Sequence, residues 1–204
     1  MFPVRDGVFM RTKFAQAGAV TPIRMVAAFA LVLGLAIVSA RAVEPTRVEI
    51  VEHGIYTLDI DATTHDANGI GQNQVSNICH VSTTTMIPMK PTLTFGFRYR
   101  VWGPSTDGIE RLTKVVTFPT EVTPPGAPKP LKSYAEVFSA RIGVVGYIGY
   151  GFDEPWELMR GIWTFQLFQR GRLLAEQNFT IVDDPQATVP RRDSGSNCFQ
   201  MSSL

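Results

Sequence analysis

The chain has 204 residues, of which 19 are basic and 18 are acidic, so its formal net charge is +1. The basic residues are scattered among the expected strands and turns instead of forming a patch, which argues against a nucleic-acid partner. The length suits a single domain with a sizeable core behind an N-terminal leader.

The first 42 residues are typical of a secretory signal peptide. Arg11, Lys13 and Arg24 form a basic region ahead of an apolar run that starts at Met25, and the run closes on Ala40-Arg41-Ala42, a small-x-small cleavage pattern. A transmembrane anchor is the alternative, but the run is shorter than the roughly 18 to 20 apolar residues that span a bilayer. We therefore expect cleavage before Val43, a periplasmic or secreted product, and no stable membrane span after cleavage.

Removal of residues 1–42 would change the charge balance. Five basic residues and one acidic residue leave with the leader, so 14 basic and 17 acidic side chains remain and the net charge becomes −3. The basic region of the leader is long, and translation could begin at Met1 or at Met10.

Beyond the leader the dominant hydrophobic period is two, as in strands with one buried face. The clearest case is 93–101, and a second is 161–168, where Trp163 shares one face with Phe165 and Leu167. A turn at Gly171, which tolerates positive φ, would join this segment to a strand over 173–182 as a hairpin. Weaker strand candidates are 48–60, 75–87, 112–118, 134–142 and 144–152.

About seven short strands without a convincing helix predict an all-β fold, an antiparallel β-sandwich over residues 43–185. Three segments interrupt the pattern. Residues 61–74 are polar and are expected to form a mobile loop, and the five prolines of 119–130 indicate a stiff loop. Residues 186–204 are polar and small, which is typical of a disordered tail.

Seven motifs stand out along the chain: Tyr147 to Leu158, Gly161 to Phe165, Gly171 to Val182, Gly54-Ile55-Tyr56, Thr83-Thr84-Thr85, Phe95 to Tyr99 and Leu112 to Pro119. Together they resemble the DUF3859 family of bacterial exported proteins over about residues 50–182. The resemblance implies an immunoglobulin-like β-sandwich that is exported, and it transfers no catalytic residues.

The sequence offers little for catalysis. The chain has three histidines and no G-x-S-x-G elbow, and the neighbours Cys79 and His80 would point to opposite faces of a strand. We therefore expect a protein that is not an enzyme and needs no cofactor, with an enzyme built on an unrecognised site as one alternative.

Metal binding is a second alternative. A copper site in the exported compartment could use His80, Met86 and Met89. The favoured interpretation is that the methionines fill the core and that His80 is a solvated residue of the polar face.

The turn around Pro155 combines acidic and aromatic residues. Asp153, Glu154 and Glu157 could ligate a cation, although such charges usually belong to a solvated turn. Tyr150 and Trp156 flank them, either as caps on the core or as surface anchors for a protein or glycan partner. We take Tyr150, Trp156, Asp153 and Glu154 as the candidate partner-binding residues of a binding or interaction module.

The two cysteines allow two states. In an oxidising compartment Cys79 and Cys198 could form a disulfide that closes a long loop. Pairing would also order the polar tail, so a buried lone thiol at Cys79 is favoured, and the pairing stays open.

Overall fold

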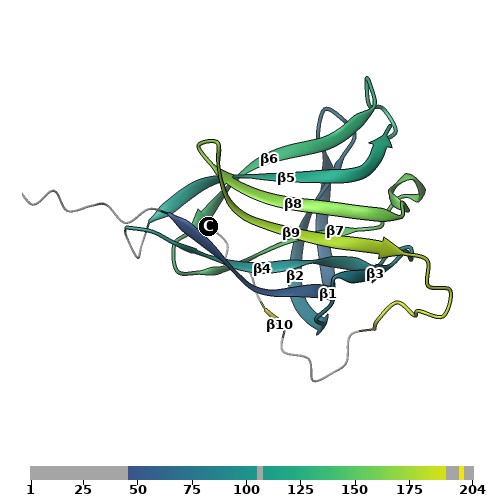
Figure 1. Ribbon diagram of the computed structural model, residues 1–204, viewed down its shortest axis with the longest axis horizontal. Helices are drawn as coiled ribbons and strands as arrows, with labels where there is room; N and C mark the ends of the chain where they lie inside the picture. The colour runs from purple at the N-terminus through teal and green to yellow at the C-terminus, as the bar shows by residue number, and fades with distance from the viewer. Residues whose placement is uncertain (1–45, 105–107, 192–197, 200–204) are drawn as a thin grey trace, which may run out of the picture. The chain divides into compact units, whose positions relative to one another are not determined.

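A computed structural model describes residues 46–104, 108–191 and 198–199 (Figure 1). The predicted signal peptide lies outside the described residues, as do 192–197 and 200–204 of the predicted tail. Among the residues that are described, no helix is long and apolar enough to cross a membrane.

Two five-stranded sheets make up the described part of the chain. The first sheet is antiparallel throughout and has the order β10 (Cys198–Phe199), β2 (Gly71–Ser82), β1 (Arg47–His65), β4 (Thr94–Trp102), β7 (Val145–Gly151). The second has the order β3 (Met86–Pro88), β9 (Arg172–Val182), β8 (Gly161–Gln169), β5 (Ile109–Val122), β6 (Leu131–Arg141), and only its β3–β9 pair is parallel. A short 3₁₀ turn, η1 (Pro155–Glu157), lies between β7 and β8.

This arrangement confirms the all-β, antiparallel immunoglobulin-like sandwich, with ten strands in the described residues where about seven were predicted. Its core is rich in aromatic rings. The Phe95 ring lies 5.2 Å from that of Phe179 and 6.0 Å from that of Trp163, centroid to centroid. Trp163, Phe165 and Leu167 are fully buried, so the inward face predicted for this strand is confirmed.

The β8–β9 hairpin is also confirmed. Its two turn residues, Arg170 and Gly171, have φ values of 49° and 80°. Positive φ at both central positions is the mark of a type I′ turn, whose twist matches that of the flanking strands.

The β1–β2 hairpin corrects the loop expected over residues 61–74. The strands continue to His65 and resume at Gly71, and a hydrogen bond of 2.7 Å joins Thr63 to Asn73 across the pair. Three register shifts interrupt the pairing between Ile55 and Ala62, and such bulges bend a ribbon. Figure 1 shows the outer half of this hairpin rising behind β8 and β5. We call its residues 58–75 the arm.

The tip of the arm is anchored to the core. Asp66 Oδ1 accepts hydrogen bonds from the backbone N–H groups of Asn68 and Ile70, and Ile70 is fully buried. A Cβ on Gly69 would lie 2.5 Å from the carbonyl oxygen of Pro125, so the tip packs closely against the loop between β5 and β6. Burial of Ile70 explains why a polar segment is held as paired strands.

Two other predicted boundaries are wrong. The segment 75–87 is not one strand, because β2 ends at Ser82 and β3 joins the other sheet beside β9. Strand β5 runs past Pro119 to Val122, where a loop was expected. Its pairing with β6 is nevertheless interrupted between Thr117 and Val122, as expected for a segment with proline, which lacks an amide donor.

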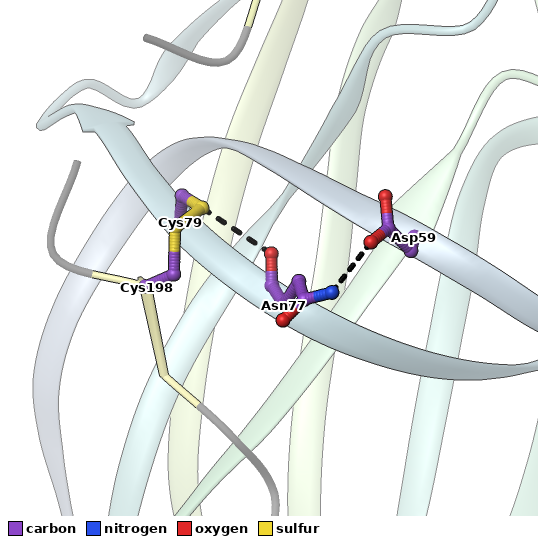
Figure 2. Close-up of a disulfide and its surroundings, with 4 residues drawn as sticks. All are labelled: Asp59, Asn77, Cys79 and Cys198. Atoms are coloured by element: carbon purple, nitrogen blue, oxygen red, sulfur yellow. Dashed lines mark hydrogen bonds between the residues drawn. A yellow bond between two sulfur atoms is a disulfide. The ribbon is translucent and has the colours of Figure 1, made fainter. Parts of the chain in front are cut away.

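The lone thiol favoured for Cys79 is wrong. Cys79 forms a disulfide with Cys198, because β10 pairs with β2 in a register that places the two residues opposite each other (Figure 2). Close by, the Asn77 amide donates a 2.6 Å hydrogen bond to Asp59 and so links β2 to β1. The bridge ties residues 119 positions apart in the chain.

Candidate functional site

A cleft of about 800 Å³ opens where the free edges of the two sheets face the arm. β6 and β7 are the edge strands that line it, together with the arm and the η1 turn. Its volume lies within the range of small-ligand and cofactor sites.

A charged pair occupies inward positions of the sheet that borders the cleft. Lys114 on β5 is two residues from both Leu112 and Val116, so it lies on the same face of the strand as these almost fully buried residues. Its ammonium lies 2.6 Å from a carboxylate oxygen of Glu136 on β6, and the two side chains are 16% and 29% exposed. A position that ordinarily holds an apolar core residue therefore carries an ion pair that faces the cleft.

Three buried tyrosines also line the cleft. The side chains of Tyr99, Tyr134 and Tyr150 are at most 7% exposed. Burial raises the pKa of each phenol above its usual value, so all three stay protonated at neutral pH. The ammonium of Lys114 lies 5.5 Å from the centre of the Tyr134 ring.

The hydroxyls of these tyrosines are not equivalent. Tyr150 donates a 2.7 Å hydrogen bond to Glu157 Oε1. No hydrogen bond joins the hydroxyl of Tyr99 or of Tyr134 to another described residue, and both residues line the cleft. They are donors that a bound molecule could use.

Glu157 is the most buried carboxylate of the site, with 5% exposure. The η1 turn places it there through a capping box in which the backbone N–H of Glu154 donates a 2.7 Å hydrogen bond to Glu157 Oε2. Burial raises the pKa of the Glu157 carboxyl, and the hydrogen bonds from Tyr150 and the backbone offset this only in part.

The family model of a domain of unknown function, DUF3859, matches residues 44–181. The chain belongs to the DUF3859 family. The match spans β1 to β9 and so includes every strand that lines the cleft of this DUF3859 domain. No curated protein matches the chain.

Solved structures similar to this DUF3859 domain include an immunoglobulin-like protein from Pseudomonas aeruginosa. It is 27% identical, and the alignment covers 70% of this chain and 99% of that one with a TM-score of 0.49. Part of an alkylpurine DNA glycosylase from Pseudomonas fluorescens, bound to DNA with an abasic site analog, aligns at 13% identity over 48% of this chain and 28% of that one, with a TM-score of 0.30. Part of a Listeria innocua β-glucosidase in complex with glucose aligns at 7% identity over 63% and 16%, with a TM-score of 0.28.

All four candidate partner-binding residues line the cleft, but they occupy different depths. A surface position for Tyr150 is wrong, because its ring packs 4.8 Å from that of Trp163 and only 7% of the residue is exposed. Tyr150 is an inward residue of β7 and caps the core. Asp153 and Glu154 are exposed and form part of the rim.

Trp156 lies at a depth between the buried Tyr150 and the exposed Asp153 and Glu154. It is half-buried, its ring packs 6.4 Å from that of Phe118, and its indole N–H has no hydrogen-bond partner among the described residues. Asp153 helps to position the arm, because it accepts a 3.0 Å hydrogen bond from the Asn73 amide. The predicted acidic turn is therefore part of the wall that holds the arm.

Two of the residues suggested for a copper site lie on strands of different sheets. His80 lies on β2 in the first sheet, with Nε2 3.3 Å from the His53 carbonyl oxygen, whereas Met86 lies on β3 in the second. Glu157 points inward instead of joining the exposed Asp153 and Glu154. Within residues 46–104, 108–191 and 198–199, no three His, Cys, Asp or Glu residues are grouped to hold a metal ion.

Lys114, Glu136 and the arm were not predicted from the sequence. A signal for Lys114 was available, because a lysine falls on the apolar face of an alternating strand. No comparable signal marked the arm, whose side chains are mostly polar along both strands and whose buried Ile70 lies in the turn between them.

Proposed function

We propose that this DUF3859 domain is an exported binding module, periplasmic or secreted, whose partner occupies the cleft between β6, β7 and the arm. The observation that carries the proposal is the ion pair of Lys114 and Glu136 at inward positions beside two tyrosine hydroxyls that make no hydrogen bond with another described residue. Apolar side chains would stabilise a sandwich at least as well there, so these polar groups point to a ligand.

Glu157 is the carboxylate whose pKa is raised by burial, and its contacts favour binding over catalysis. Both oxygens of Glu157 already accept hydrogen bonds, one from Tyr150 and one from a backbone amide. A general base must reach the substrate proton, and Glu157 is only 5% exposed with its oxygens held by Tyr150 and the backbone of the η1 turn. Glu157 is therefore a structural support of the cleft wall, and the partner is a protein or a glycan.

A pull-down from the exported fraction tests this proposal, with the mature domain as bait. Trp156→Ala should remove the partners that the wild-type domain enriches, because the indole is the half-buried aromatic of the cleft wall. The matched control is Ile162→Ala, a change at an apolar residue that is 57% exposed on β8 outside the cleft.

Folding is checked by far-UV circular dichroism and cooperative melting. If Trp156→Ala does not fold, the double change Tyr99→Phe and Tyr134→Phe removes only the two unpaired hydroxyls and keeps both rings. A folded variant of either kind that retains every wild-type partner would place the binding site elsewhere. A stoichiometric copper ion in the purified domain would instead favour the metal-binding alternative.

Export has its own test. Because the apolar run ends in Ala40-Arg41-Ala42, N-terminal sequencing of the exported protein should begin at Val43. A mature protein found in the cytoplasm with residues 1–42 intact would contradict export.

A further inference from the structure

We propose that the occupant of the cleft is an extended, basic polypeptide segment that adds as a strand to the free edge of β7 and places an arginine or lysine side chain between the sheets. The inference rests on the proposed function and adds the chemical class of the partner. Three features of the cleft carry it.

The first feature is charge. Four carboxylates that line the cleft make no salt bridge with a described lysine or arginine, whereas Glu136 is paired with Lys114. Arg141 is the one arginine that lines the described cleft. The potential therefore favours a cationic partner. The four carboxylates are Asp61, Asp153, Glu154 and Glu157.

The second feature is the floor, which provides groups that suit a cation on a long apolar stem. Tyr134 lines the cleft, is 7% exposed, and makes no hydrogen bond through its hydroxyl with another described residue. Tyr150 and Trp156 line the same cleft. Aromatic rings beside carboxylates attract guanidinium and ammonium groups, and they pack against the methylene stem.

The third feature is the edge itself, which favours a polypeptide over a glycan. Among the described strands β7 pairs only with β4, so alternate residues present N–H and C=O groups without a strand partner along its other side. Every residue from Val145 to Gly151 lines the cleft. Exposed edges are commonly protected by charged residues or proline, yet β7 contains neither, whereas β6 carries Lys132, Glu136 and Arg141. An unprotected edge beside a cleft is suited to strand addition by a peptide.

The test uses capped heptapeptide libraries with the full disulfide-bonded protein, and measures the bound fraction by fluorescence polarisation. The central residue is fixed as Arg, Gln or Glu, and a fourth library carries Arg with N-methylated alternate amides. The Arg library should bind about tenfold more tightly than the Gln library. The Glu library should not bind, because its carboxylate is repelled by those of the cleft. The N-methylated library should not bind either, because its methylated amides cannot donate hydrogen bonds to the edge of β7.

A double change of the exposed rim, Asp153→Asn with Glu154→Gln, should bring the affinity for the Arg library to within about twofold of that for the Gln library. The matched control is Glu176→Gln, at an exposed position on β9 outside the cleft. Equal binding of the Arg and Gln libraries, unchanged binding of the N-methylated library, or an unaffected rim variant would overturn the inference.

A soluble hexasaccharide of N-acetylglucosamine is the fifth probe. Binding of this sugar without binding of the Arg library would identify a glycan partner and would overturn the inference, while the cleft would remain a binding site. A pull-down that is insensitive to Trp156→Ala and to the double tyrosine change would instead reject the cleft itself.

Discussion

The β8–β9 hairpin and the cleft side belong to the same sandwich but carry different kinds of residue at their inward positions. On β8 the inward residues Trp163, Phe165 and Leu167 are apolar and fully buried, and a two-residue turn joins β8 to β9. On the cleft side, β5 and β6 place an ion pair inward, and the arm lines the cleft together with β6 and β7. The comparison separates the part of the domain that stabilises the fold from the part that is available for binding.

The largest expected effect comes from a change in the buried face of β8. Phe165→Ala should lower the free energy of unfolding by about 3 to 5 kcal/mol, because a fully buried aromatic ring is removed. Gln166→Ala, whose side chain hydrogen-bonds to Glu176 on the outer face, should change it by no more than about 0.5 kcal/mol. Urea denaturation measures both, and equal effects would reject the assigned register.

A smaller effect is expected from a change that detaches the arm from the core. Ile70→Ala should cost about 2 to 4 kcal/mol, because the buried side chain is what holds a polar hairpin against the core. Hydrogen exchange should show loss of protection over residues 58–75 while β8 and β9 stay protected. Ile60→Ala is the control, since that residue is on the same arm but 49% exposed. Uniform loss of protection across the domain would contradict a locally anchored arm.

Replacing the ion pair of Lys114 and Glu136 tests whether the cleft side could carry an apolar core. Lys114→Met alone should cost about 1 to 3 kcal/mol, because it leaves the half-buried Glu136 carboxylate without its partner. The double change of Lys114 and Glu136 to Met should fall within about 1 kcal/mol of the wild type and should abolish binding. A double variant as unstable as the single one would show that the pair is required for folding.

The smallest effect is a pH dependence. The pKa of Glu157 is raised in the folded domain above its ordinary value of 4.5, so the protonated form is the one that favours folding. The contribution of this carboxyl is fully present below pH 4.5 and is lost as the pH rises through the folded-state pKa. Relative to Glu157→Gln, the wild type should therefore lose stability as the pH rises. The exposed Glu154→Gln is the control, and a pH-independent difference for Glu157→Gln would contradict the assignment.

Local pattern determined the part of the fold that repeats with period two. Alternation predicted the inward face of Trp163, Phe165 and Leu167, and Gly171 marked the turn that follows. These features depend only on neighbours along one hairpin, so a single sequence contains them. The family resemblance over residues 50–182 added the immunoglobulin-like sandwich.

The candidate site was found in part by the same means. The aromatic and acidic composition around Pro155 drew attention to Tyr150, Trp156, Asp153 and Glu154, and all four do line the cleft. Their depths could not be read from the sequence, because Tyr150 and Glu157 are buried by one another and by a core assembled from distant strands.

Tertiary structure alone decided the features that depend on long-range register. Cys79 meets Cys198 only because β10 pairs with β2, and the arm is ordered only because Ile70 reaches the core beside the β5–β6 loop. Lys114 is tolerated at an inward position because Glu136 pairs with it where the two sheets part. The sequence by itself thus determined the sandwich and its apolar face through local alternation, whereas packing between distant segments determined the cleft, its charges and its covering arm.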